Sequence, residues 1–246
     1  MTSSPGEVAV RRDGPVAVLT LVRPEKLNAL SSHLEESLLA SLSSEEVRTA
    51  GAVVVTGGMS VFSAGADLDE LRAMSADDIA SYYAGSGGVY EVVAALPQPT
   101  VSAIAGWCVG GGLELALCTD FRVASLDAVF ALPEVSIGIV PSSGGTYRLT
   151  RMVGPARARD LILSGRRMTA DEALAWGLVS SVVPAGEHIK HAVSLAASLA
   201  EQPLHAIAHA KRLIDTIADG LSREEALRLE QDAYISLNDL QKETHD

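Results

Sequence analysis

The sequence predicts an α/β fold in which helices cover a largely buried sheet. Two short runs, 51–58 and 100–106, are apolar without alternating polar residues, which indicates strands buried on both faces. A glycine-containing turn and then a helical pattern follow each run, as in chains that alternate strands with covering helices. After residue 183 the pattern is helical to the end of the chain. We therefore expect an α/β body over 1–183 and a helical region over 184–246.

The first elements are a hairpin and a helix. Two alternating segments, 7–12 and 15–21, flank Asp13-Gly14, a dipeptide that favours a two-residue turn. Ser32 and Glu35 have the spacing of a capping box, and leucines follow them at helical spacing. The chain therefore begins with two antiparallel strands and a helix that starts near Ser32.

The later elements follow from the same signals. A strand over 128–135, a helix over 141–149 and a short strand over 178–184 complete the predicted body. Further helix starts with capping-box spacing are expected at Thr169 and Ser222. Helix ends or breaks are expected at Gly177, Pro203 and Gly220. No linker, repeat or low-complexity segment separates these elements.

Charge and cysteine content restrict the class of protein. The formal net charge is −12, from 31 acidic and 19 basic residues, whereas proteins that bind nucleic acid normally carry a basic face. Cys108 and Cys118 lie in an apolar stretch without CxxC spacing, which predicts free, buried thiols in a reducing compartment. Because the N-terminus lacks the apolar run of a signal peptide and no run could span a bilayer, we expect a cytoplasmic protein.

Several familiar catalytic patterns are missing from the sequence. It contains no Walker A motif, no GxSxG elbow and no GxGxxG fingerprint. His205 and His209 have a zinc-like spacing, but Ala206 stands where a zinc protease carries glutamate, so we predict no metal site. Ser142 and Ser143 precede a helix and are interpreted as caps rather than as nucleophiles.

One acid interrupts the most apolar and glycine-rich stretch of the chain. Glu114 follows the glycines 110–112 within GWCVGGGLELALCTD. An unpaired buried carboxylate costs on the order of several kcal/mol, so Glu114 needs a partner or a chemical role. If a helix begins at the glycines, its first N–H groups lack intrahelical acceptors and the backbone can closely approach a ligand. The same helix end favours an anion.

A second glycine turn, at Gly65, and a second acid, Glu134, have the same features as the glycines 110–112 and Glu114. In FSAGADL, 62–68, a strand ends, the chain turns at Gly65 and a helix is predicted near Ala66, whose N–H is a second candidate donor. Two converging backbone donors form an oxyanion hole. Glu134 follows a strand, and two carboxylates in one pocket push their pKa values apart, so that one acts as base and the other as acid. The alternative interpretation is a simple helix-start charge and a solvated loop acid.

Four motifs, in order, resemble the enoyl-CoA hydratase/isomerase (crotonase) superfamily. They are RPEKLNAL (23–30), FSAGADL (62–68), GWCVGGGLELALCTDFRVAS (106–125) and FALPEVSIGIVPSSGGTYRL (130–149), and TADEALAWGLVSSVVP (169–184) is similar too. The resemblance covers nearly the whole chain. It implies a spiral of repeated β-β-α units, with an acyl-CoA-binding core over 1–183 and a helical region over 184–246 that builds trimers, often stacked as hexamers.

The resemblance also implies roles for individual residues. Ala66 and Gly111 supply the N–H groups that hold a thioester carbonyl, and Glu114 and Glu134 match the two acids of the hydratases. Contacts to CoA or the acyl group are implied for Arg23, Lys26, Leu27, Ala64, Asp67, Leu68 and Gly110, with Lys211 as a further candidate. No cofactor is implied apart from the coenzyme A of the substrate.

The presence of both acids implies hydration of a 2-enoyl-CoA to a 3-hydroxyacyl-CoA. Relatives that keep the oxyanion hole but lose an acid catalyse isomerisation, decarboxylation or other acyl-CoA reactions, and some relatives bind RNA or are non-catalytic. These remain the alternatives. Ser142-Ser143 and Tyr147 depart from the usual Gly-Ala and Gln, which concerns the acyl pocket and hence the substrate. Trp107 is either a packing residue or part of the acyl wall.

Overall fold

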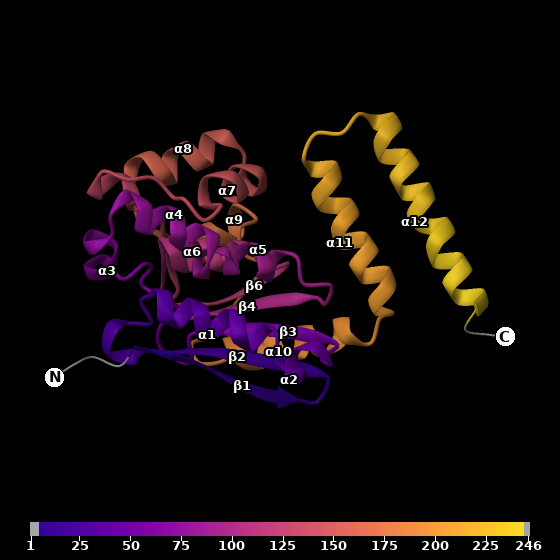
Figure 1. Cartoon of the computed structure of the whole chain (residues 1–246), viewed down its shortest axis with the longest axis horizontal. Helices are drawn as coiled ribbons and strands as arrows, with labels where there is room; N and C mark the ends of the chain where they lie inside the picture. Colours follow the sequence, from indigo (N-terminus) through magenta and orange to yellow (C-terminus); the bar gives the residue numbers. More distant parts are fainter. Residues whose placement is uncertain (1–4, 244–246) are drawn as a thin grey trace.

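A six-stranded sheet forms the centre of the computed structural model, which describes residues 5–243 (Figure 1). Its strands run in the order β1-β2-β3-β4-β6-β9, and only the β1/β2 pair is antiparallel. They are β1 (Glu7–Asp13), β2 (Val16–Val22), β3 (Ala52–Thr56), β4 (Thr100–Ile104), β6 (Phe121–Ser125) and β9 (Ser181–Val183). Every residue of β3 and β4 is buried, as their unbroken apolar runs predict.

A second, smaller sheet accounts for the spiral. It has the order β5-β7-β8, with β5 (Trp107–Val109), β7 (Val129–Ala131) and β8 (Met168–Thr169). β4 and β6 belong to the large sheet. The strand that follows each of them, β5 or β7, belongs to the small sheet and is itself followed by a helical segment. The segment after β3 shows the same pattern, because Ser63 forms an isolated β-bridge with Cys108 of β5 and thus lies at the edge of the small sheet. The predicted repetition of strand, strand and helix is therefore confirmed.

The large sheet separates two apolar cores. Val16 and Val18 of β2 face one core, together with Ala192 of α10 (His188–Ala200). Ala17 and Leu19 face the other core, on the side of α1 (Ser32–Leu42). Because successive side chains of a strand point to opposite faces, β2 contributes to both cores and its apolar run is explained.

The other helical elements of residues 5–243 connect these strands. They are α2 (Glu45–Arg48), α3 (Leu68–Ala73), α4 (Ala76–Ala84), α5 (Val89–Ala94), α6 (Gly111–Leu117), α7 (Gly145–Val153), α8 (Pro155–Ser164) and α9 (Ala170–Ala175). Short 3-10 turns occur at η1 (Pro24–Lys26), η2 (Ser86–Gly88) and η3 (Glu134–Ile137). Among the helices of residues 5–243, none combines the length and the apolar character that a membrane crossing requires.

The hairpin turn and the start of α1 each differ by one residue from their predicted positions. Asp13 pairs with Val16, so the hairpin loop is Gly14-Pro15, with Gly14 at φ 56°. The N-cap of α1 is Ser31 and not Ser32, because the Ser31 hydroxyl accepts the Leu34 N–H. Glu35 consequently takes no part in a capping box, and its side chain is directed into the protein.

The first helix after the predicted boundary at 183/184 packs on the body, so the C-terminal region is not fully separate from it. α10 packs on the large sheet, against β2, β3, β4 and β6. Only α11 (Leu204–Ala218) and α12 (Arg223–Glu243) stand beside the body as a helical pair, at the right of Figure 1. The ammonium group of Lys211 in α11 bonds to the carbonyls of Leu96 and Gln98 and to Asp120, at 2.8 Å each. Lys211 therefore fastens this helix to the body.

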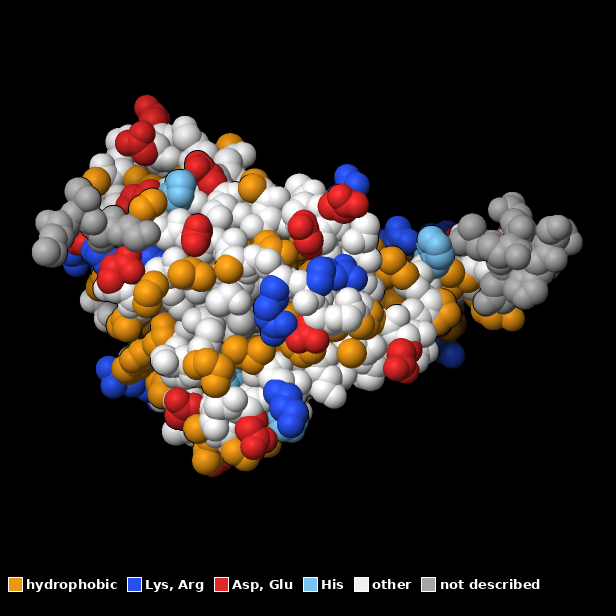
Figure 2. All heavy atoms as spheres, turned by 90° about the horizontal axis from the view of Figure 1, so that it is seen from below, with side chains coloured by type: hydrophobic (Ala, Val, Ile, Leu, Met, Phe, Trp, Pro, Cys, Tyr) orange, Lys and Arg blue, Asp and Glu red, His pale blue; other side chains and the backbone are white. Residues whose placement is uncertain are grey.

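One face of the molecule is shown as a surface in Figure 2. Basic side chains occur there singly or in small groups between acidic and apolar ones, and no continuous basic stripe is visible on this face. Cys108 and Cys118 are buried free thiols, as predicted.

Candidate active site

The two glycine turns meet at one cavity of about 320 Å³. A Cβ built on Gly111 would lie 3.6 Å from the amide nitrogen of Ala66, and one built on Gly65 would lie 3.5 Å from the amide nitrogen of Gly111. Gly65 and Gly110 have φ values of 95° and 54°, which side chains rarely allow. The turns are thus shaped by glycine and lie in direct contact.

Both predicted backbone donors line this cavity. Ala66 lies between Gly65, whose carbonyl accepts the Leu30 N–H, and Asp67, whose N–H is donated to Leu30. Gly111 is the first residue of α6, where an N–H has no intrahelical acceptor. Within residues 5–243 neither the N–H of Ala66 nor that of Gly111 has a hydrogen-bond acceptor. The pair is therefore available to bind one oxygen of a ligand.

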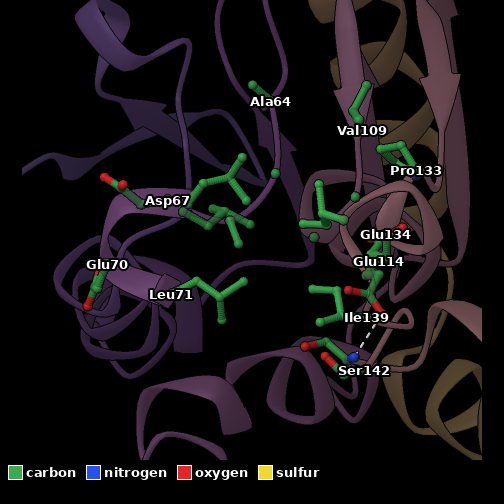
Figure 3. A pocket seen from close by; sticks show the side chains of 18 of the residues that line it. Ala64, Asp67, Glu70, Leu71, Val109, Glu114, Pro133, Glu134, Ile139 and Ser142 are labelled. Atoms are coloured by element: carbon green, nitrogen blue, oxygen red, sulfur yellow. Dashed lines mark hydrogen bonds between the residues drawn. The ribbon is translucent and has the colours of Figure 1, made fainter. Parts of the chain in front are cut away.

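Glu114 is held by the backbone of another loop. Its side chain projects from α6 and is 4% exposed. Its Oε1 accepts the N–H of Ser143 at 2.7 Å and the N–H of Gly145 at 2.8 Å. Figure 3 shows Glu114 directed toward the loop that carries Ser142. Burial raises the pKa of Glu114, while these two bonds favour its anion and oppose that rise.

Glu134 lies beside Glu114, as Figure 3 shows, but in a different environment. It is the first residue of η3, is 9% exposed, and its Oε1 lies 3.1 Å from the position of a Cβ built on Gly110. Its buried Oε2 has no hydrogen-bond partner among the described residues. Burial and, to a lesser extent, the charge of Glu114 raise the pKa of Glu134 to about 7. Glu134 is therefore the acid of the pair that keeps its proton closer to neutral pH.

Two facing acids and two free amides in one cavity agree with the family that the sequence resembles. The sequence model described as enoyl-CoA hydratase/isomerase matches residues 11–244. The chain belongs to the enoyl-CoA hydratase/isomerase family. It is an enzyme family, and the match spans both the body and the helical tail.

Curated relatives and solved structures agree with this family. The chain is 40% identical over 229 residues to a "Probable enoyl-CoA hydratase" of Rhizobium meliloti, covering 93% of this chain and 88% of that one. It is 37% identical to "Probable enoyl-CoA hydratase 2, mitochondrial" of Arabidopsis thaliana, covering 91% and 78%. The crystal structure of an enoyl-CoA hydratase from Bacillus anthracis superposes with a TM-score of 0.86 at 33% identity, covering 97% and 96%.

Four of the residues predicted to contact an acyl-CoA line the cavity of this family member: Ala64, Asp67, Leu68 and Gly110. Arg23 does not line it. Its guanidinium is buried against Asp67 at 2.8 Å and also bonds to the carbonyl of Ala29 at 3.0 Å. The structure therefore gives Arg23 a bracing role for the Ala66 turn, rather than the surface position that a contact with CoA would need.

Lys26 and Leu27 lie on the same first loop, outside the cavity lining. Lys26 pairs with Asp69 at 3.0 Å and is partly exposed. Leu27 has a positive φ of 52° and is half exposed, and its carbonyl accepts the N–H of Ala64. The loop thus supports the Ala66 turn from outside, and these two side chains face its outer surface.

Of the positions that depart from the family pattern, some line the cavity and one does not. Ser142 and Ser143 line the cavity, and Ser142 bonds to the hydroxyl of Tyr83. Tyr147 is exposed and bonds to Asp219 at the start of the turn after α11, so it does not shape the cavity. Trp107 also lies outside the lining, with Arg167 4.5 Å above its ring, which favours the packing role.

Sequence reasoning missed three polar residues at this site. Tyr82 and Tyr90 line the cavity, and both hydroxyls bond to Glu35. Glu35 was interpreted as a capping residue, and the tyrosines lie in a glycine-interrupted helical segment without a recognisable motif. Only the fold brings α1, α4 and α5 together at this point, so no local signal could have found the group.

Proposed function

We propose that the protein is an enoyl-CoA hydratase, which adds water across the double bond of a 2-enoyl-CoA to give a 3-hydroxyacyl-CoA. The observation that supports this most strongly is the shared cavity of Glu114, Glu134 and the amides of Ala66 and Gly111. Hydration needs a base for water, an acid for Cα and a site for the enolate oxygen, and this set supplies all three.

The amides of Ala66 and Gly111 bind the thioester carbonyl oxygen. Their two hydrogen bonds withdraw charge from the conjugated system, so the β-carbon becomes electrophilic. As water adds, negative charge collects on the held oxygen, and the fixed donors bind this enolate more strongly than the ground-state carbonyl. Removing one such donor in other enzymes costs about 10²–10³ in rate.

The hydrogen bonds of the two acids assign their roles. Glu114 accepts two backbone N–H bonds at Oε1, which favours its ionised form and leaves Oε2 to accept a proton from water. Glu134 has a raised pKa and holds its proton more firmly, so it delivers that proton to Cα. The hydroxide equivalent forms the new C–O bond at Cβ, the enolate collapses with protonation at Cα, and the pair again holds one proton in total.

The coenzyme A moiety enters as part of the substrate, and these steps require no metal ion or redox cofactor. We propose that the nucleotide part is held outside the cavity. Cys108 and Cys118, both buried free thiols, support a cytoplasmic location.

We also propose that the protein forms a homotrimer, or a hexamer of two trimers. α11 and α12 stand beside the body and carry large exposed apolar side chains: Leu204, Ile214, Leu227, Tyr234 and Ile235. Exposed apolar surface of this kind is typical of protein interfaces. Light scattering after gel filtration tests this proposal, with three or six copies expected and a monomer as the contrary result.

A panel of acyl-CoA thioesters with mass detection tests the proposed activity. With crotonyl-CoA the product should gain the mass of one water as the absorbance of the conjugated thioester disappears. Loss of CO₂ from a carboxylated acyl-CoA without hydration would indicate a decarboxylase, and a shifted double bond at unchanged mass would indicate an isomerase. No turnover of any thioester, with RNA retained in a filter assay, would indicate the non-catalytic alternative.

A further inference from the structure

A buried polar group forms one wall of the acyl cavity. The hydroxyls of Tyr82 (α4) and Tyr90 (α5) both donate to Oε1 of Glu35 (α1), at 2.9 Å each. Both tyrosines line the cavity, while Glu35 lies behind them and is 2% exposed. We refer to Glu35, Tyr82 and Tyr90 as the tyrosine–glutamate cluster.

The cluster lies close to the reacting end of the cavity. A Cβ built on Gly111, the second oxyanion donor, would lie 3.1 Å from the hydroxyl oxygen of Tyr90. Gly87 accommodates the ring of Tyr82, since a Cβ there would lie 2.7 Å from Cε1 of that ring. The two phenols are therefore fixed in the cavity wall, and the Tyr90 hydroxyl lies beside the turn whose amide is proposed to hold the thioester carbonyl.

A purely structural role does not account for this cluster. Burying a carboxyl group is costly unless all its polar atoms are satisfied, and Oε2 of Glu35 has no partner among the described residues. Leucine in place of Glu35 would continue the apolar pattern of α1 at less cost. The cluster is better explained if its hydroxyls serve a ligand in the cavity.

The direction of the hydrogen bonds defines what the cluster can recognise. A phenol has one O–H to donate and lone pairs to accept. Because both O–H groups are directed to Glu35, each oxygen offers the cavity an acceptor and no donor. The complementary group on a ligand is therefore a hydrogen-bond donor.

The charges of the cavity exclude acyl groups that carry a carboxylate. Its lining residues include four acids, Asp67, Glu70, Glu114 and Glu134, and among the lining residues that the structure describes there is no Lys, Arg or His. A carboxylate on the acyl chain would have to lose its hydration there without any basic partner. The acyl group that fits is uncharged.

We propose that the cavity selects acyl-CoA thioesters whose acyl group is short, uncharged and carries a hydroxyl group, which donates a hydrogen bond to a tyrosine of the cluster. This inference rests on the proposed function, because it takes the cavity to be the acyl site. Sites built around a substrate hydroxyl discriminate strongly against analogues that lack it.

Binding of unreactive, saturated thioesters tests the inference without relying on turnover. The probes are hexanoyl-CoA, its 4-, 5- and 6-hydroxy derivatives, and hexanedioyl-CoA, each titrated into the full-length protein by calorimetry. We expect at least one hydroxylated probe to bind about tenfold more tightly than hexanoyl-CoA. Hexanedioyl-CoA should bind at least about tenfold more weakly than hexanoyl-CoA.

Tyr82→Phe and Tyr90→Phe remove one hydroxyl each and keep the ring that fills the space. One of these variants, or both together, should abolish the preference for the hydroxylated probe and leave the Kd of hexanoyl-CoA within about twofold. Tyr234→Phe, on the exposed face of α12, is the matched control and should keep the preference.

Glu35→Leu gives a result that loss of packing alone would not produce. Without the carboxylate, the two O–H groups are released to donate into the cavity. 5-Oxohexanoyl-CoA, which only accepts hydrogen bonds, should then gain about tenfold in affinity relative to the hydroxylated probe.

Equal binding of hexanoyl-CoA and all three hydroxylated probes to the wild type would overturn the inference. A preference that survives in the double Phe variant would also overturn it. Failure of the proposed hydration is seen separately, as absence of turnover with crotonyl-CoA, while these binding measurements still give their own answer.

Discussion

The N–H of Gly145 donates to Oε1 of Glu114 at 2.8 Å, and the same glycine leaves no room for a side chain beside that oxygen. A Cβ on Gly145 would lie 2.8 Å from Oε1 and 2.9 Å from Cγ of Glu114. The carboxylate of one helix is thus positioned by the first residue of another, α7. The absence of a side chain at Gly145 is part of the active-site geometry.

Gly145→Ala should therefore displace the Glu114 carboxylate. We expect the kcat of crotonyl-CoA hydration to fall by about 10- to 100-fold, because a shift of about 1 Å in a catalytic group can cost that much. Gly88→Ala is the control, since its Cβ would lie 3.9 Å from the nearest atom, the carbonyl oxygen of Tyr83. Equal turnover of both variants would show that Glu114 does not need this support.

The pH dependence of hydration should follow the shared proton of the two acids. Below the pKa of Glu114 the base is protonated, and above that of Glu134, about 7, the acid is ionised, so activity is lost on both sides. The prediction is a bell-shaped profile of kcat/KM whose alkaline limb has an apparent pKa near 7, a value that belongs to the pair. Initial rates measured from about pH 5 to pH 9 check this, and a flat profile above pH 6 would contradict it.

Glu35 should make the fold less stable as pH rises. Burial raises its pKa from 4.5 to about 7, so the folded state binds its proton more tightly than the unfolded state does. Its favourable contribution is complete below about pH 4.5 and is lost as pH rises to about 7, by at most about 3 kcal/mol. Glu35→Gln keeps the acceptor for both tyrosines and removes this loss.

Urea denaturation of Glu35→Gln at about pH 5 and pH 8 measures the effect. The variant should gain stability relative to wild type between the two pH values, whereas the exposed neighbour variant Glu36→Gln should not. A parallel pH dependence of wild type and Glu35→Gln would mean that Glu35 titrates normally.

The fold could be predicted further from the sequence than the site could. The buried strands β3 and β4 follow from unbroken apolar runs, and the helix starts at α9 and α12 follow from local capping residues. α1 was misplaced by one residue because Ser31 and Ser32 are equally good caps, and only the observed bond from Leu34 distinguishes them.

The candidate site could be predicted from local sequence patterns only in part. Residue type and glycine content suggested Glu114 and the two turns, but the meeting of Glu114 with Glu134 depends on how the spiral stacks its units. Arg23 has the chemistry of a phosphate ligand, yet its partner is Asp67, which comes from a distant turn. Pairings between remote segments leave no local pattern, so the meeting of Glu114 with Glu134 was expected chiefly from the family resemblance, and the Arg23–Asp67 pair was not expected at all.

The Arg23–Asp67 ion pair should matter for stability as well as for catalysis. Both side chains are less than a tenth exposed. Burial tends to raise the pKa of Asp67, but hydrogen bonds from Arg23 and from the backbone N–H of Asp69 hold it below its usual value. Arg23→Met leaves this carboxylate buried without its cation, and the free energy of unfolding should fall by about 3–5 kcal/mol.

Chemical denaturation at neutral pH measures this loss. The double variant Arg23→Met/Asp67→Asn should recover part of it, because no charge is then left unpaired. If the single variant were as stable as wild type, the pair would not brace the turn that carries the Ala66 amide.

The most direct test of the account is the turnover of crotonyl-CoA by Glu114→Gln and Glu134→Gln, measured beside their thermal stability and their affinity for butyryl-CoA. Each variant should lose at least about 10³-fold in kcat, since each removes one of two proton-transfer groups. Folding and thioester binding should be nearly unchanged. Turnover within a few-fold of wild type in both variants would contradict the claim that these two acids add water to a thioester held by the amides of Ala66 and Gly111.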